Sequence, residues 1–159
     1  MLITGITGYI GKHVAAELLK QNYEVVGTIR SLAKAEATRS ALAAIPGAAG
    51  VTFVEADLLS DMGWDKAVEG CDYVMHLASP FVIAEPKDEN EMITPAVEGT
   101  KRVIKAAMRA GVKRMVLTSS IVSMTSGKPS GKYGSDSWSD TNQAIGAYSK
   151  SKTLAERAA

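Results

Sequence analysis

The sequence has little cysteine and little histidine. Its 159 residues contain one cysteine, Cys71, and two histidines. A single cysteine excludes an internal disulfide framework and fits a reducing compartment. Cysteines and histidines are also too few and too scattered for a structural zinc site. We therefore expect no metal.

The sequence also has no excess of charge and no long hydrophobic run. Its 18 Lys and Arg against 17 Asp and Glu leave a net charge of +1, which offers no broad electrostatic attraction for nucleic acid or an anionic membrane. No apolar run approaches the ~20 residues that a membrane span needs. The chain enters a glycine-rich segment almost directly after Met1, so we see no secretory signal. These features predict a cytoplasmic protein without nucleic-acid or membrane partners.

Apolar and helical segments alternate along the chain. The segments expected to be strands are 1–3, 24–29, 51–55, 72–77 and 114–118. The segments expected to be helices are 10–21, 32–44, 61–69, 90–110 and 144–159. A polar loop is expected over 123–142. The alternation predicts an α/β fold with a Rossmann-type doubly wound parallel sheet, as one domain over 1–159. In such sheets, ligands bind outside the carboxyl ends of the strands.

Glycines recur at positions 5, 8 and 11, between the first strand and the first helix. Glycine permits positive φ and close approach of the backbone to a ligand. The N-terminus of the next helix presents free N–H groups that suit a pyrophosphate. The spacing G-x-x-G-x-x-G differs from the standard dinucleotide fingerprint, so a glycine turn without a ligand stays an alternative. The residues expected to contact a cofactor here are Gly5, Thr7, Gly8, Tyr9, Ile10 and Gly11.

Two further predictions concern the first helix and the end of the second strand. Helical spacing places Ile10, Val14, Leu18 and Leu19 on the apolar face of the first helix. An NAD-binding protein carries an acid about 20 residues beyond the glycine motif to hold the ribose 2′-hydroxyl. No acid stands there in this sequence.

Cations stand at that place instead. Arg30 follows the second strand, and Lys34 lies one turn further on. A guanidinium pairs well with phosphate, which favours the 2′-phosphate of NADP(H) over NAD(H). A solvated charge is the alternative for both side chains, and more so for Lys34.

Residues that follow the third and fourth strands complete the expected cofactor site. The Asp57 carboxylate can accept a hydrogen bond from an adenine amino group while Leu58 packs on the ring. A turn or helix-capping aspartate is the competing interpretation. After the fourth strand, Leu77 is followed by Ala78 and Ser79, which are small enough to let the backbone pass along a cofactor.

The last helix carries the candidate proton donor. Tyr148 and Lys152 are four residues apart and share a helix face. An ammonium near a phenol favours phenolate, which makes tyrosine a usable general acid near neutral pH. A serine after strand 114–118 can hydrogen-bond the same substrate oxygen. We expect Lys150 to lie at the surface and His76 to be a strand histidine rather than a catalytic one.

These segments together resemble the N-terminal part of an extended short-chain dehydrogenase/reductase of the epimerase/dehydratase superfamily, most nearly its dihydroflavonol reductase-like group. The matching segments are 4–11, 29–31, 57–58, 76–81, 95–100, 117–120, 138–140 and 148–156. The resemblance implies NADPH-dependent reduction of a small-molecule ketone or aldehyde. It assigns the catalytic serine to Ser120, with Ser119 still open, and the proton donor to Tyr148. It implies that Lys152 lowers the pKa of Tyr148 and binds the nicotinamide ribose. It also implies cofactor contacts at Thr118, Tyr148 and Lys152.

Extended members of the family are about twice as long as this chain. The resemblance therefore implies that residues 1–159 form a cofactor-binding half. Most of the substrate pocket and the final strand or strands of the sheet would lie outside it, which leaves an exposed sheet edge. It also implies a homodimer through the helices near 90–110 and 145–159.

Two other functions stay open. One is an NAD-dependent nucleotide-sugar epimerase or dehydratase, which Arg30 disfavours because those enzymes commonly carry an acid at its place. The other is a regulatory module that binds a dinucleotide without turnover. The Tyr148 and Lys152 pair disfavours it, because a pure binder needs no proton donor.

Overall fold

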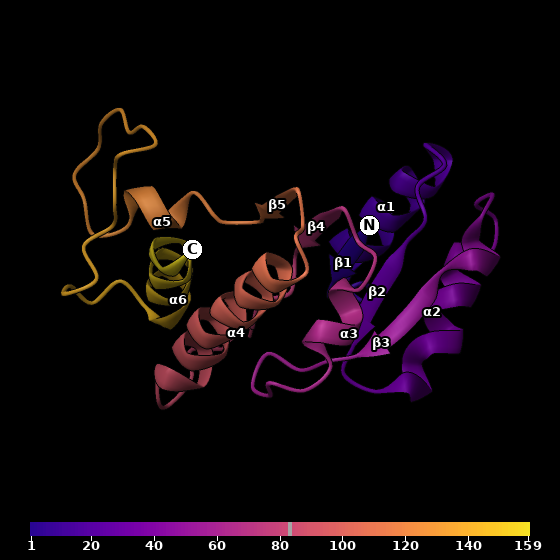
Figure 1. The fold of residues 1–159 in the computed structure, drawn as a ribbon. Coiled ribbons are helices and arrows are strands. Elements are labelled where there is room, and N and C mark those ends of the chain that lie inside the picture. The colour runs from indigo at the N-terminus through magenta and orange to yellow at the C-terminus, as the bar shows by residue number, and fades with distance from the viewer. Residues whose placement is uncertain (83) are drawn as a thin grey trace.

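Five parallel strands form the central sheet of this computed structural model, which describes residues 1–82 and 84–159 (Figure 1). The strands are β1 (Leu2–Thr4), β2 (Val26–Ile29), β3 (Thr52–Glu55), β4 (Tyr73–His76) and β5 (Arg114–Leu117). Their order is β3-β2-β1-β4-β5, and every neighbouring pair is parallel. The strands β2 and β3 lie on one side of β1, and β4 and β5 lie on the other, so the strand order reverses between β1 and β4. Such a reversal opens a crevice for a ligand at the carboxyl ends of the strands.

Helices cover both faces of the sheet, which confirms the predicted doubly wound fold. Leu2 packs in a cluster with Trp64 of α3 (Trp64–Val68) and Val103 of α4 (Asn90–Arg109). Its neighbour Ile3 points to the opposite face and packs with Leu19 of α1 (Tyr9–Lys20). The helices are α1 (Tyr9–Lys20), η1 (Leu32–Lys34), α2 (Ala35–Leu42), η2 (Ala48–Gly50), α3 (Trp64–Val68), α4 (Asn90–Arg109), α5 (Val122–Thr125) and α6 (Ala147–Ala158).

The prediction for the apolar face of α1 is wrong at Ile10. Its side chain is 57% exposed, whereas Gly11, Ala15 and Leu19 are buried. The cause is the close approach of α1 to the preceding turn. A Cβ on Gly11 would lie 2.3 Å from the carbonyl oxygen of Gly5. Small residues therefore occupy the buried face, and the larger Ile10 lies outside.

The prediction of a loop over 123–142 is wrong at its start, where α5 forms a single helical turn. Ser123 anchors this turn, because its amide donates to the Ser120 carbonyl and its own carbonyl accepts from the Ser139 amide. The last helix also begins later than predicted. Gly146 has a φ of 80°, outside the helical range, so α6 begins at Ala147.

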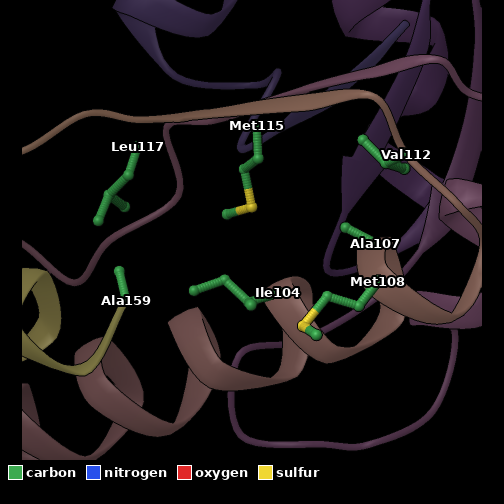
Figure 2. Close-up of a pocket in the computed structure, with 7 residues that line it drawn as sticks. All are labelled: Ile104, Ala107, Met108, Val112, Met115, Leu117 and Ala159. Carbon is green, nitrogen blue, oxygen red and sulfur yellow. The ribbon is translucent and has the colours of Figure 1, made fainter.

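The strand β5 forms one edge of the described sheet. Beside it lies a cavity of about 250 Å³. Figure 2 shows side chains of β5 directed toward those of α4 across this space. The lining residues are all apolar: Ile104, Ala107, Met108, Val112, Met115, Leu117 and Ala159. The lining has no polar side chain to orient a substrate, so we place the active site elsewhere. Within 1–82 and 84–159, no helix is both long and apolar enough to cross a membrane.

Candidate active site

A cavity of about 550 Å³ lies at the carboxyl ends of β1, β2, β3 and β4. This is the position that a doubly wound sheet gives to its ligand. We call it the strand-end cavity. The predicted cofactor contacts that line it are Gly5, Thr7, Gly8, Arg30, Lys34, Asp57, Leu58, Leu77, Ala78 and Ser79. The structure therefore brings together residues from four separate segments of the chain.

The glycine turn forms one wall of the strand-end cavity. Gly5 has a φ of 70°, and a Cβ there would lie only 3.1 Å from the Cα of Ala78. Gly8 precedes α1 and donates its amide hydrogen to the Gly5 carbonyl at 3.0 Å. Among the described residues, no side chain caps α1, and its first turn contains no acid. The amide groups of that turn and the helix dipole suit a bound anion at this wall.

A cationic rim follows β2. The exposed Arg30 and Lys34 line the cavity, and neither side chain forms a hydrogen bond or ion pair with another residue of the described part of the chain. Glu55, which is opposite Ile29 in the sheet, accepts a hydrogen bond from the Leu32 amide at 3.2 Å. Its carboxylate thus helps hold the loop that carries both cations. Two cations without a carboxylate partner suit a phosphate group.

Asp57 forms the turn interaction that was the competing interpretation, and it also lies at the strand-end cavity. Its Oδ1 accepts a hydrogen bond from the Leu59 amide at 2.8 Å, which is the turn interaction. The buried indole of Trp64 supports this turn, since its Nε1 donates to the carbonyls of Asp57 and Ser60. Sequence reasoning missed Trp64, because an apolar residue at a helix start is ordinarily assigned to the core.

Leu58 contacts α4 as well as the cavity. A Cβ on Gly99 would lie 2.6 Å from the Leu58 side chain, so a glycine in the middle of α4 makes room for this leucine. The packing fixes Leu58 at the cavity wall. Other lining residues that the sequence did not indicate include Thr28, Phe81, Glu91 and Pro95.

His76 is a buried strand histidine, as predicted. Its Nδ1 lies 2.7 Å from Thr4 Oγ1, which also accepts hydrogen bonds from the amides of Leu77 and Ala78. With its oxygen accepting twice, the Thr4 hydroxyl donates its hydrogen to Nδ1. The imidazole then carries its proton on Nε2, which lies 3.3 Å from Thr100 Oγ1. Burial lowers the pKa of His76 to about 4, in keeping with this neutral form.

Tyr148 and Lys152 lie on one face of α6, beside the carboxyl ends of the strands. The Tyr148 ring meets Phe81 edge-on, with centroids 5.6 Å apart, and Phe81 lines the strand-end cavity. Lys152 is 8% exposed, and its Nζ donates to the carbonyl of Thr118 at 3.3 Å. Burial lowers the pKa of the Lys152 ammonium. A further, small cavity is lined by Lys152 and Thr118, and it shares Ala78 and Ser79 with the strand-end cavity.

The structure distinguishes the two serines that follow β5. The Ser119 hydroxyl donates to the carboxylate of Glu156 in α6. The Ser120 hydroxyl forms no hydrogen bond with any residue in the described ranges, while its carbonyl accepts from the Ser123 amide. Ser120 therefore keeps a free hydroxyl.

The prediction that Lys150 lies at the surface is wrong. Its side chain is 18% exposed, and its Nζ lies 2.8 Å and 2.9 Å from the two carboxylate oxygens of Glu89. Glu85 of the same segment accepts a hydrogen bond from the Ala147 amide at 2.5 Å. The segment that precedes α4 folds against the first turn of α6 and supplies partners that the local sequence of α6 does not reveal.

Six predicted cofactor contacts do not line the strand-end cavity: Tyr9, Ile10, Gly11, Thr118, Tyr148 and Lys152. Tyr9 and Ile10, on the first turn of α1, are 78% and 57% exposed, and the Tyr9 ring meets His13 edge-on. Gly11 is buried and allows α1 to pack closely on the turn. In the described part of the chain, no three His, Cys, Asp or Glu side chains gather as metal ligands do.

Known proteins of similar sequence include several reductases. A dihydroflavonol 4-reductase from Hordeum vulgare is 36% identical over 168 residues, which cover 100% of this chain and 47% of the relative. A putative anthocyanidin reductase from Ginkgo biloba is also 36% identical, covering 99% of this chain and 49% of the relative. The chain thus spans about half the length of these relatives.

Solved structures of similar fold are also about twice the length of this chain. The yeast methylglyoxal/isovaleraldehyde reductase Gre2, solved in complex with NADPH, matches with a TM-score of 0.84 and 28% identity, over 99% of this chain and 50% of that chain. Alfalfa vestitone reductase matches with a TM-score of 0.74 and 31% identity, over 99% and 50%. The sequence matches the NAD dependent epimerase/dehydratase family over residues 1–159. The chain belongs to that family.

Proposed function

We propose that this protein is an NADPH-dependent oxidoreductase that reduces a ketone or aldehyde to an alcohol. The observation that carries the proposal is the strand-end cavity, which combines a glycine turn and a cationic rim with Tyr148 close by. Names of the similar proteins support the same chemistry, because the relatives are reductases and Gre2 was solved with NADPH. Residues 1–159 would then form the dinucleotide-binding domain.

The residues that line the cavity fit a phosphorylated dinucleotide. Gly5 and Gly8 present backbone rather than side chain to the cavity, which leaves room for a pyrophosphate at the start of α1. Arg30 and Lys34 supply two cations for the 2′-phosphate that distinguishes NADP(H). Asp57 keeps one carboxylate oxygen outside its turn hydrogen bond, and this oxygen can accept from the adenine amino group.

The chemistry divides between the cofactor and three side chains. Bound NADPH supplies the hydride. Tyr148 donates its hydroxyl proton to the carbonyl oxygen as that oxygen becomes an alcohol, and the Lys152 ammonium stabilises the phenolate that is left. The Ser120 hydroxyl donates a hydrogen bond to the same oxygen, which orients the carbonyl. The free hydroxyl of Ser120 supports this role, because that of Ser119 is engaged by Glu156.

The substrate class is a small-molecule carbonyl compound.

We also expect a homodimer that uses α4 and α6. These helices pack against each other, and α6 lies at the end of the molecule away from α1 and α2 (Figure 1). Sedimentation velocity on the protein tests the dimer, since a single monomeric species would contradict it.

Replacement of Tyr148 by Phe tests the proposed function. We expect the Tyr148→Phe variant to lose turnover by about 100-fold or more, since general acids contribute on that scale, while its affinity for NADPH is kept. The assay follows NADPH absorbance with isovaleraldehyde and methylglyoxal. Tyr73→Phe, at the opposite end of the sheet, is the matched control and should keep full turnover. Unchanged turnover in Tyr148→Phe would remove Tyr148 as the acid. Tight NADPH binding by the parent protein without turnover would favour a binding module.

A further inference from the structure

Glu156, in the last turn of α6, binds the segment that follows β5. Its Oε2 accepts hydrogen bonds from the hydroxyls of Ser119 and Ser123, the latter at 2.6 Å. Ser119 follows the end of β5 closely, and Ser123 is the buried residue of α5. One carboxylate oxygen therefore ties the last helix to both ends of the segment 119–123.

Ser120 lies inside the segment that Glu156 holds. The Ser120 carbonyl accepts a hydrogen bond from the Ser123 amide at 3.0 Å, and Ser123 Oγ lies 2.7 Å from the same oxygen. Ser123 is 1% exposed, so it has little freedom to move. The backbone of Ser120 is thereby fixed on both sides. On one side it is bonded directly to Ser119, whose hydroxyl is held by Glu156, and on the other its carbonyl is hydrogen-bonded to Ser123. A shift of the Glu156 carboxylate would pass to Ser120 through these contacts.

Two oppositely charged side chains of α6, Lys152 and Glu156, bind this segment instead of pairing with each other. Lys152 and Glu156 have the four-residue spacing at which helical ion pairs form. Within the described residues they form no such pair, because Lys152 donates to the Thr118 carbonyl and Glu156 accepts from Ser119 and Ser123. Tyr148 lies one turn earlier on the same face. A single helix face thus carries the proposed acid and both anchors of the segment 118–123.

We propose that Glu156 is a positioning residue for Ser120, an inference that rests on the proposed function. It does not line the strand-end cavity, although it lines the small cavity beside Lys152 together with Ser119, and it would act through Ser119 and Ser123. The serine hydroxyl and the Tyr148 phenol must reach one carbonyl oxygen. Misplacement of a reacting group by about 1 Å can cost about 100-fold in rate. Removal of the carboxylate should therefore lower kcat while leaving the affinity for NADPH unchanged.

The first experiment compares Glu156→Ala with Glu156→Gln in NADPH-dependent reduction of isovaleraldehyde. We expect Glu156→Ala to lower kcat by about 10-fold or more, with the dissociation constant for NADPH unchanged within about threefold. Glu156→Gln keeps one carbonyl oxygen as an acceptor and should recover most of the lost kcat. Ser126→Ala is the matched control, because it removes a different hydrogen bond between these regions, to Ser149 of α6. It should stay within about twofold of the parent.

A double-mutant cycle with Ser120→Ala separates positioning from a general structural role. If Glu156 acts through Ser120, Glu156→Ala should cause no further loss of kcat in the Ser120→Ala background. An equal loss in both backgrounds would overturn the proposal, as would parent-like kcat in Glu156→Ala. Should that variant fail to fold, the combined Ser119→Ala and Ser123→Ala changes remove the same hydrogen bonds from the other side, together with the contact of Ser123 Oγ to the Ser120 carbonyl. They must give at least the same kcat loss and the same cycle.

Failure of this inference is distinguishable from failure of the proposed function. If Tyr148→Phe keeps full turnover, the proposed acid is wrong and the premise falls with it. If Tyr148→Phe and Ser120→Ala both lose turnover but Glu156→Ala does not, the reductase assignment stands and positioning by Glu156 is wrong. If Ser120→Ala keeps full turnover, Glu156 has no catalytic serine to position at that residue, and the inference is overturned.

Discussion

Mild acid should destabilise this protein through His76. The imidazole is 1% exposed, and the Thr4 hydroxyl, whose oxygen already accepts from two amides, donates to its Nδ1. A second proton on the ring, at Nδ1, would place an N–H donor opposite the Thr4 hydroxyl, which is itself a donor. It would also place a buried positive charge near Lys152, whose charge lowers the pKa further after burial itself. The folded protein therefore disfavours the imidazolium.

The size of the effect follows from the pKa. The pKa of His76 falls from 6.5 to about 4 on folding, so between these values the unfolded chain binds more protons than the folded one. The free energy of unfolding therefore decreases as the pH falls through this window. One pKa unit corresponds to about 1.4 kcal/mol, which gives a loss of about 3 kcal/mol by pH 4. Below that pH, both states are protonated and the loss from His76 levels off.

Urea unfolding of the parent, His76→Gln and His13→Gln at a series of pH values tests this reasoning. The amide of Gln can accept from Thr4 and donate to Thr100 without titrating. His76→Gln should lack the loss of about 3 kcal/mol between pH 6.5 and 4, and its curve should diverge from that of the parent. His13 is exposed on α1, so His13→Gln should follow the parent. Parallel curves for the parent and His76→Gln would refute the argument.

Two further predictions concern packing and an ion pair. Gly11→Ala should lower the free energy of unfolding by about 2 kcal/mol or more, because its methyl group meets backbone, while Gly50→Ala, with open space around the new methyl, should change it by less than about 0.5 kcal/mol in the same urea assay. Lys150→Met breaks the pair with Glu89 and should cost about 1 kcal/mol, whereas Lys20→Met, at an exposed pair, should cost almost nothing. Equal effects within either pair of variants would contradict the respective argument.

The fold was predictable because its signals are local. Each strand is a short apolar run, and each gap between strands has helical periodicity or turn residues. The glycine turn was visible for the same reason, since Gly5 and Gly8 stand where the backbone must turn and begin α1. The carboxyl ends of parallel strands meet at one edge, so the candidate cofactor residues could be collected without knowing their contacts.

Contacts between distant segments could not be predicted in this way. Lys150 looked like a surface lysine because its partner Glu89 is 61 residues away in the sequence. Glu156 and Ser119 are separated by 37 residues, and neither stands out by local pattern. Periodicity also failed at Ile10, because it ranks residues by hydrophobicity, whereas the close packing of α1 selects for small size.

The most direct test of the proposed function is a parallel titration of the protein with NADPH and NADH, repeated with Arg30→Gln. Charge-assisted contacts to the 2′-phosphate should make the parent bind NADPH about tenfold more tightly than NADH or better, and Arg30→Gln should lose most of that preference. Equal or tighter binding of NADH by the parent would contradict the account and favour an NAD-dependent epimerase or dehydratase.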